Sequence, residues 1–158
     1  MQLTLAERLL LRNQLKIMKA LNIPDSSPDQ YDEQIAILEG GYAVYYPDVL
    51  SGLNRDGTDA SVTAEVLEIL DMFRALDTAK RKGLTVSRGF EGFDANNDPH
   101  YGFAHFVLDV QGSYAESGPA RNSHSSATLP RYRRMVSTWQ SQGRSHTLSQ
   151  ADVDAILN

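Results

Sequence analysis

Residues 90–105, FEGFDANNDPHYGFAH, hold the densest group of side chains that could bind a metal ion. Asp94, Asn96 and Asp98 occupy the first three ligand positions of a calcium-binding loop. That loop needs Gly at its sixth position and an acidic residue at its twelfth, but Pro99 and His105 stand there. Proline lacks the left-handed freedom that the turn requires. We therefore expect no calcium site, and we predict that Asp98 caps a helix beginning at Pro99.

A second stretch, NRDGTDASVTAE at 54–65, also imitates a calcium loop. Asn54, Asp56 and Thr58 take ligand positions, and Glu65 falls at the twelfth. The sixth position is Asp59, where the loop needs Gly. Asp59 and Ser61 are better explained as capping residues of a following helix, so we expect no metal here either.

The four histidines do not form a metal-binding pattern. His105 and Asp109 are four residues apart and share one helix face, but a closed site normally takes three protein ligands or more. His100 and His105 would lie about 140° apart around a helix and could not chelate together. We expect a solvent-exposed His105–Asp109 pair, no metal and no cofactor. The absence of cysteine excludes disulfides and thiolate sites.

No arrangement typical of nucleophilic catalysis occurs. The sequence SHSS at 123–126 places Ser beside His, but in a stretch that we expect to be a flexible loop. The nucleophile elbow, the P-loop and the HExxH motif are absent. The catalytic residues stay unknown, and we lean towards a protein that is not an enzyme.

The elements that must position these candidate residues are predicted to be mainly α-helices. Thr4 and Glu7 form a capping box that opens a helix at about 4–22. We expect its core face to be the apolar stripe Leu10, Ile17 and Leu21, widened by Leu9 and Met18. Ser27 and Pro28 then begin a second helix that ends at Gly40 and Gly41, and its expected inward side chains are Tyr31, Ile35 and Leu38.

The remaining chain continues this pattern. An apolar seam spaced 4, 3, 4 and 3 predicts a helix over 61–82, and Lys80, Arg81 and Lys82 suit its last turn. The seam comprises Val62, Val66, Ile69, Phe73 and Leu76. A third apolar seam comprises Phe103, Val107, Val110 and Tyr114; a strand in FAHFVLDV is the alternative. Pro130 and Ser149 open two further helices. The first should face inward with Tyr132, Met135, Val136 and Trp139. The sequence thus predicts an all-α fold: a single multihelical domain over 1–158 with about six helices and one long polar loop at about 116–130.

Composition limits the possible functions. The chain has 158 residues, 41% of them apolar, and a net charge of -5. No apolar run approaches the roughly 18 residues that span a membrane, and the N-terminus lacks the features of a secretory signal. We expect a cytoplasmic protein that does not bind membranes. We read the cluster Arg131, Arg133 and Arg134 as a solvated helix face, because an acidic chain is a poor partner for nucleic acid.

Seven segments in this order resemble the YfbU-like family of small bacterial proteins: AERLLLRNQLKIM, EGGYAV, EILDMFRAL, GFD, QGSY, YRRMVSTW and LSQADVDAIL. They span nearly the whole chain. The resemblance implies an all-helical, self-associating protein and supplies no catalytic roles. The family pattern does not require His105. The matching polar or aromatic positions are Arg8, Asn13, Gln14, Lys16, Glu39, Tyr42, Asp94, Tyr114, Tyr132, Arg134 and Trp139.

From these observations we expect a binding or regulatory protein that acts as a homodimer. A second hypothesis is an enzyme or small-ligand protein with a polar pocket near Asn13, Gln14, Tyr42 and Asp94. A third is a regulator linked to nucleic acid through the arginine cluster. The candidate ligand-binding residues are Asn13, Gln14, Glu39, Tyr42, Asp94, Tyr114 and Arg134. The sequence does not identify the ligand, protein partner, pathway or oligomer number.

Overall fold

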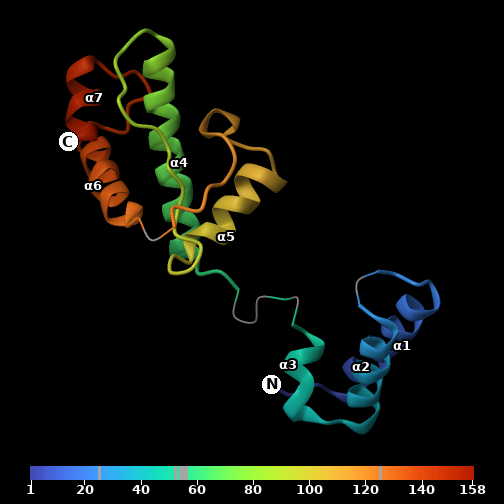
Figure 1. Cartoon of the computed structure of the whole chain (residues 1–158). Coiled ribbons are helices and arrows are strands. Elements are labelled where there is room, and N and C mark those ends of the chain that lie inside the picture. Colours follow the sequence, from blue (N-terminus) through green and yellow to red (C-terminus); the bar gives the residue numbers. More distant parts are fainter. Residues whose placement is uncertain (25, 52, 54–56, 125) are drawn as a thin grey trace. The chain divides into compact units, whose positions relative to one another are not determined.

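The computed structural model describes residues 1–24, 26–51, 53, 57–124 and 126–158. The chain divides into two compact units, Met1–Asp56 (unit 1) and Gly57–Asn158 (unit 2), which we describe separately (Figure 1). The all-α prediction is confirmed: the described residues contain seven α-helices, and their only β feature is an isolated bridge between Phe93 and Asn122. The expectation of a single domain over 1–158 stays a prediction.

Unit 1 is a helical pair followed by short turns. It contains α1 (Leu5–Ala20), α2 (Pro28–Gly40), the 3-10 turn η1 (Ala43–Tyr45) and α3 (Tyr46–Val49). Both predicted caps are confirmed, since Thr4 and Ser27 each form a capping box at the start of their helix. Gly41 ends α2 with a φ of 69°, a conformation that glycine adopts without a Cβ penalty.

The core of unit 1 corrects the predicted orientation of α1. Leu11 and Leu15 of α1 pack on Ile37, Leu38 and Tyr46, the buried residues of this cluster. Most of the stripe that we expected to be buried instead faces solvent. Four of its five members keep much of their surface exposed: Leu9 47%, Leu10 68%, Ile17 60% and Leu21 67%. The fifth, Met18, is half-buried.

Unit 2 is built around one long helix. Its elements are α4 (Ala60–Arg81), α5 (His100–His105), the π-helical turn η2 (Phe106–Val110), the 3-10 turn η3 (Ala115–Ser117), α6 (Thr128–Ser141) and α7 (Gln150–Leu157). Helix α4 contacts α5, α6 and η3, and α7 packs on α6 (Figure 1). The predicted α4 seam is buried at Val66, Ile69, Phe73 and Leu76. The predicted inward face of α6 is also confirmed, and it comprises Tyr132, Met135, Val136 and Trp139.

The helix predicted from Pro99 is shorter than its seam suggested. Val107 is buried, but the backbone widens into the η2 turn, so Val110 is 67% exposed. The helix ends there, and Tyr114 has a left-handed φ of 56° outside it. The prediction that Asp98 caps the helix is also wrong. Its carboxylate accepts a hydrogen bond from the Asp94 backbone N–H at 3.0 Å.

The polar stretch between η3 and α6 packs closely against the segment before α5. Phe93 N–H donates to the Arg121 carbonyl, and Ser123 N–H donates to the Phe93 carbonyl. Gly92 makes this approach possible: its φ is 90°, and a Cβ there would lie 2.0 Å from the Arg121 carbonyl oxygen. Helix α6 begins at Thr128, two residues before the predicted Pro130, and the Thr128 hydroxyl donates to the Gly92 carbonyl.

None of the helices in the described parts of the chain combines the length and the apolar character that crossing a membrane requires. The expected cytoplasmic location stays a prediction.

Candidate functional site

Unit 1 carries most of the exposed apolar surface of the described residues. Eleven of the fourteen exposed large apolar side chains lie in its 56 residues, a little over a third of the chain. Large contiguous apolar surface marks an interaction site more often than chance exposure does. The eleven are Met1, Leu5, Leu9, Leu10, Ile17, Leu21, Ile23, Tyr42, Val44, Tyr45 and Leu53.

The outward side of α1 has the spacing of a helix-pairing seam. Ala6, Leu10, Asn13, Ile17 and Ala20 follow one another at intervals of 4, 3, 4 and 3 residues, and all five are exposed. This repeat keeps side chains along one line of a helix that faces another helix. We call these five residues the α1 seam. Asn13, a sequence-predicted site residue, is its single polar member.

Three of the cationic side chains of α1 bond to α2. Arg8 donates to the Leu38 carbonyl near the C-terminus of α2, where a cation suits the helix dipole. Lys16 donates to the Glu39 carboxylate at 2.8 Å, and this bond holds the pKa of Glu39 below its ordinary value. Lys19 pairs with Asp32. These three cations are therefore directed towards α2, and the charged group that contacts the α1 seam is Arg12, which donates to the Asn13 side chain.

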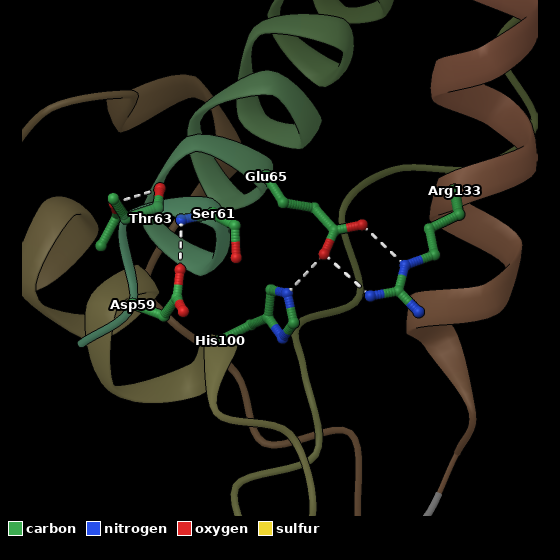
Figure 2. Close-up of polar contacts among 7 residues, drawn as sticks. Asp59, Ser61, Thr63, Glu65, His100 and Arg133 are labelled. Atoms are coloured by element: carbon green, nitrogen blue, oxygen red, sulfur yellow. Dashed lines mark hydrogen bonds and ion pairs between the residues drawn. The ribbon is translucent and has the colours of Figure 1, made fainter.

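A polar cluster in unit 2 joins three elements. Figure 2 shows the Glu65 carboxylate of α4 between the His100 ring of α5 and the Arg133 guanidinium of α6. His100 Nε2 lies 2.7 Å from Glu65 Oε2, and Arg133 donates to the two carboxylate oxygens at 2.6 and 2.9 Å. The Arg133 bonds lead the effects that lower the pKa of Glu65 to about 2, and the His100 bond adds to them. The cluster therefore holds a carboxylate anion at neutral pH.

The geometry of this cluster suits a structural tie better than acid–base catalysis. His100 is 3% exposed, its ring stacks on Phe93, and its Nδ1 is buried without a hydrogen-bond partner. When Nε2 carries the ring proton it donates to Glu65, and Nδ1 is then a buried acceptor without a donor among the described residues. A general base must reach a substrate proton, and neither ring nitrogen is accessible to one.

A second polar network surrounds Tyr114, a sequence-predicted site residue. Its hydroxyl donates to Asp71 at 2.8 Å, and the Arg74 guanidinium lies 3.9 Å from the centre of its ring. Arg74 also pairs with Glu116. Burial, together with the Asp71 carboxylate, raises the pKa of Tyr114 to about 12. The phenol therefore stays neutral, and the network fixes η3 on α4.

Asp94 stabilises its own turn. One carboxylate oxygen accepts from the Asn96 backbone N–H at 3.0 Å, and the other accepts from the Asn97 side chain at 2.6 Å. This is an Asx-turn, and it uses the residues that imitate a calcium loop. In the second stretch that resembles a calcium-binding loop, at 54–65, Asn54 and Asp56 lie outside the described residues. Its Glu65 bonds His100 and Arg133. No group of three potential ligands suited to a metal ion occurs among the residues that the structure describes.

The predicted His105–Asp109 pair forms in the structure, whereas the Ser123 hydroxyl does not bond to a histidine. His105 and Asp109 lie 3.6 Å apart with the His side chain half exposed, which confirms the predicted solvent-exposed pair. For the SHSS stretch, Ser125 lies outside the described residues. The Ser123 hydroxyl donates to the Ser126 carbonyl and not to a histidine.

The seven candidate ligand residues fall in both units. Asn13, Gln14, Glu39 and Tyr42 lie in unit 1, whereas Asp94, Tyr114 and Arg134 lie in unit 2. Within unit 1, Arg12 links two of them: it donates to Asn13 and lies 3.8 Å from Glu39. Gln14 lines an open groove between α1 and α2, and Tyr42 is 57% exposed. A shared pocket near Asn13, Gln14, Tyr42 and Asp94 stays a prediction.

The arginine cluster of α6 is largely neutralised within unit 2. Arg131 pairs with Glu91 and Arg133 pairs with Glu65, at 2.7 and 2.6 Å. Arg134 is exposed and donates to the Pro130 carbonyl. A phosphate backbone would have to compete with these carboxylates. The expectation that nucleic acid is not the partner stays a prediction.

Comparison with known proteins gives a match over the whole chain. The family model for the YfbU domain matches residues 1–158. The UPF0304 protein MJECS11 of Methanocaldococcus jannaschii is 32% identical to this chain over 168 aligned residues, which cover 96% of each protein. The family-model match includes the α1 seam and the whole of unit 2.

Proposed function

This chain belongs to the YfbU domain family over its whole length, and on that premise we propose that it is a binding protein that acts as a homodimer. The two copies associate through the α1 seam. The observation that carries this proposal is the exposed apolar side of α1, where Leu10 and Ile17 keep 68% and 60% of their surface open to solvent.

The free energy available on this surface supports association. Fully burying a Leu or Ile side chain contributes roughly 1.5–3 kcal/mol. A two-fold interface uses the same patch on each copy, so every side chain contributes twice. Leu5, Leu9 and Leu21 flank the seam with 74%, 47% and 67% exposure and enlarge the area that a partner would cover.

Asn13 argues for a second copy as the occupant. Where two α1 helices meet around the centre of the seam under two-fold symmetry, Asn13 of one copy faces Asn13 of the other. The two amides can then hydrogen-bond across the interface. A shift of register would set Asn13 against an apolar side chain, which costs free energy because a buried amide loses its partner. A single polar residue in an apolar seam is known to specify register in this way.

Sedimentation velocity of the full chain tests this proposal. At micromolar concentration we expect one species of twice the 17.5 kDa chain mass, with dissociation on dilution. The apolar seam predicts that added salt leaves the mass unchanged, since salt screens charge pairs and not apolar contacts. A monomer mass at all concentrations would overturn the proposal, because another occupant would then have to cover the seam.

A further inference from the structure

Unit 2 contains a cavity formed by its own residues. It has a volume of about 210 Å³ and opens where α4 meets the segment before Glu91 and the region of η3. Its apolar lining comes from Phe73 and Leu76 of α4 and from Val86 and Phe90. Its polar lining comprises Asp77, Lys80, Arg88, Glu116, Ser117 and Arg121.

The charge of this cavity is positive although the whole chain is acidic. Three cations line it, Lys80, Arg88 and Arg121. Its two acids are already engaged by arginines outside the lining: Asp77 pairs with Arg81, and Glu116 pairs with Arg74. The acids in the lining therefore do not balance the positive charge of the three lining cations.

Two of the three cations have no carboxylate partner. Among the residues that the structure describes, neither Lys80 nor Arg121 forms an ion pair, whereas Arg88 lies 3.4 Å from Glu91. A cavity whose lining carries an excess of positive charge favours negatively charged ligands. Arginine also suits carboxylate and phosphate groups, because its planar fork can donate two parallel hydrogen bonds.

Ser117 supplies a further polar group at the same cavity. Its hydroxyl oxygen is buried and has no hydrogen-bond partner among the residues that the structure describes. Buried polar groups are nearly always hydrogen-bonded, so an unpartnered hydroxyl beside a cavity calls for an explanation. An anion bound between the cations would provide an acceptor for this hydroxyl.

The apolar lining indicates that the ligand is more than an inorganic ion. Phe73 and Phe90 are nearly buried and pack edge to face, with ring centres 5.5 Å apart. They present aromatic surface to the cavity that a flat apolar group could cover. Ligand sites commonly combine an apolar lining with a few polar groups that fix orientation.

We propose that this cavity binds a small organic anion, with its carboxylate or phosphate group held by Lys80, Arg121 and Ser117 and its apolar body lying on Phe73 and Phe90. The cavity volume limits the body to about one ring. This binding does not depend on the dimer, because every lining residue lies in unit 2.

Titration calorimetry of the full chain tests the ligand class with four probes. Phenyl phosphate and benzoate carry both features, inorganic phosphate lacks the apolar body, and benzyl alcohol lacks the charge. We expect at least one of the two aromatic anions to bind at least about tenfold more tightly than inorganic phosphate and benzyl alcohol, a difference of about 1.4 kcal/mol. The stronger of the two identifies the preferred anionic group.

Paired variants test the location. Lys80→Gln and Arg121→Gln are each expected to weaken aromatic-anion binding about tenfold. Lys82→Gln, an equal charge change at an exposed position two residues beyond Lys80, should leave the affinity unchanged. Circular dichroism melting confirms that each variant is folded. No binding at millimolar concentrations, equal binding of benzyl alcohol or inorganic phosphate, or an equal loss in Lys82→Gln would each overturn the proposal.

Discussion

The substitution Ile17→Asp is expected to raise the dissociation constant of the homodimer by at least about 100-fold. Ile17 is 60% exposed within one chain and lies next to Asn13 on the α1 seam. Losing its burial costs roughly 1.5 kcal/mol or more per copy, and symmetry applies that cost twice. The introduced carboxylate would add a desolvation cost in each copy. Sedimentation velocity across a dilution series measures the change directly.

Val110→Asp is the matched control. Val110 has a similar exposed fraction, 67%, but lies on η2 in unit 2. The same charge is introduced, so a general effect of added acidity would appear in both variants. We expect Val110→Asp to keep the dimer. Equal dissociation in the two variants, or none in Ile17→Asp, would contradict the assignment of the interface to α1.

The substitution Glu65→Gln is expected to lower the free energy of unfolding of unit 2 by about 2 kcal/mol at pH 7, a value reduced for the partial exposure of the carboxylate. Glu65 is the only carboxylate that bonds both His100 and Arg133 among the described residues. A neutral amide cannot accept the two arginine bonds as a charged carboxylate does. Part of the tie between α4 and α6 is thereby lost.

The substitution Glu65→Gln should also change how the free energy of unfolding depends on pH. The native pKa of Glu65, about 2, lies below its ordinary value of 4.5. A lowered pKa means that the stabilisation is complete above about 4.5 and is lost as the pH falls towards 2. Chemical unfolding at several pH values should therefore show a smaller loss of stability between about pH 5 and pH 3 in Glu65→Gln than in the wild type.

Glu91→Gln serves as the control for this prediction. Glu91 also pairs with an arginine of α6, but its side chain is 42% exposed. Exposed pairs contribute about 0–1 kcal/mol. We expect a small change in stability and an acid dependence like that of the wild type. A loss of stability as large as that of Glu65→Gln would show that the His100 and Arg133 bonds contribute no more to the free energy of unfolding than an exposed ion pair does.

Local sequence signals predicted the starts of several helices. The capping residues Thr4, Ser27 and Ser149 act within three residues of themselves, so no distant contact is needed to form their hydrogen bonds. Periodicity likewise identified the buried faces of α4 and α6. It chose the wrong face of α1, because that helix carries apolar residues on two sides. Leu11 and Leu15 pack on α2, whereas Leu10, Ile17 and Leu21 form a second apolar side. Both sides have helical spacing, so the spacing does not reveal which one is covered.

The α5 region shows a second limit of local patterns. The seam from Phe103 to Tyr114 assumed 3.6 residues per turn throughout, but the η2 turn changes the register after His105. Gly112, with a φ of 69°, then lets the chain leave the helical path. These two backbone changes moved Val110 to the surface and Tyr114 out of the helix.

The polar clusters could not be predicted, because their members are distant in sequence. Glu65, His100 and Arg133 are brought together only by the packing of α5 and α6 on α4. The cavity cations Lys80 and Arg121 have the same origin. The sequence places Lys80 in the last turn of a helix, where a cation suits the dipole, and no feature of the sequence connects it with Arg121.

One cross-linking measurement tests the central claim, self-association through the α1 seam, most directly. The chain has no cysteine, so Asn13→Cys introduces a single thiol where the seam should meet its copy. On mild oxidation, we predict a disulfide-linked dimer of Asn13→Cys on a non-reducing gel, because facing residues come within disulfide reach. Val110→Cys, equally accessible but outside the seam, should stay largely monomeric on the gel. Equal cross-linking of the two variants, or none at position 13, would contradict the account.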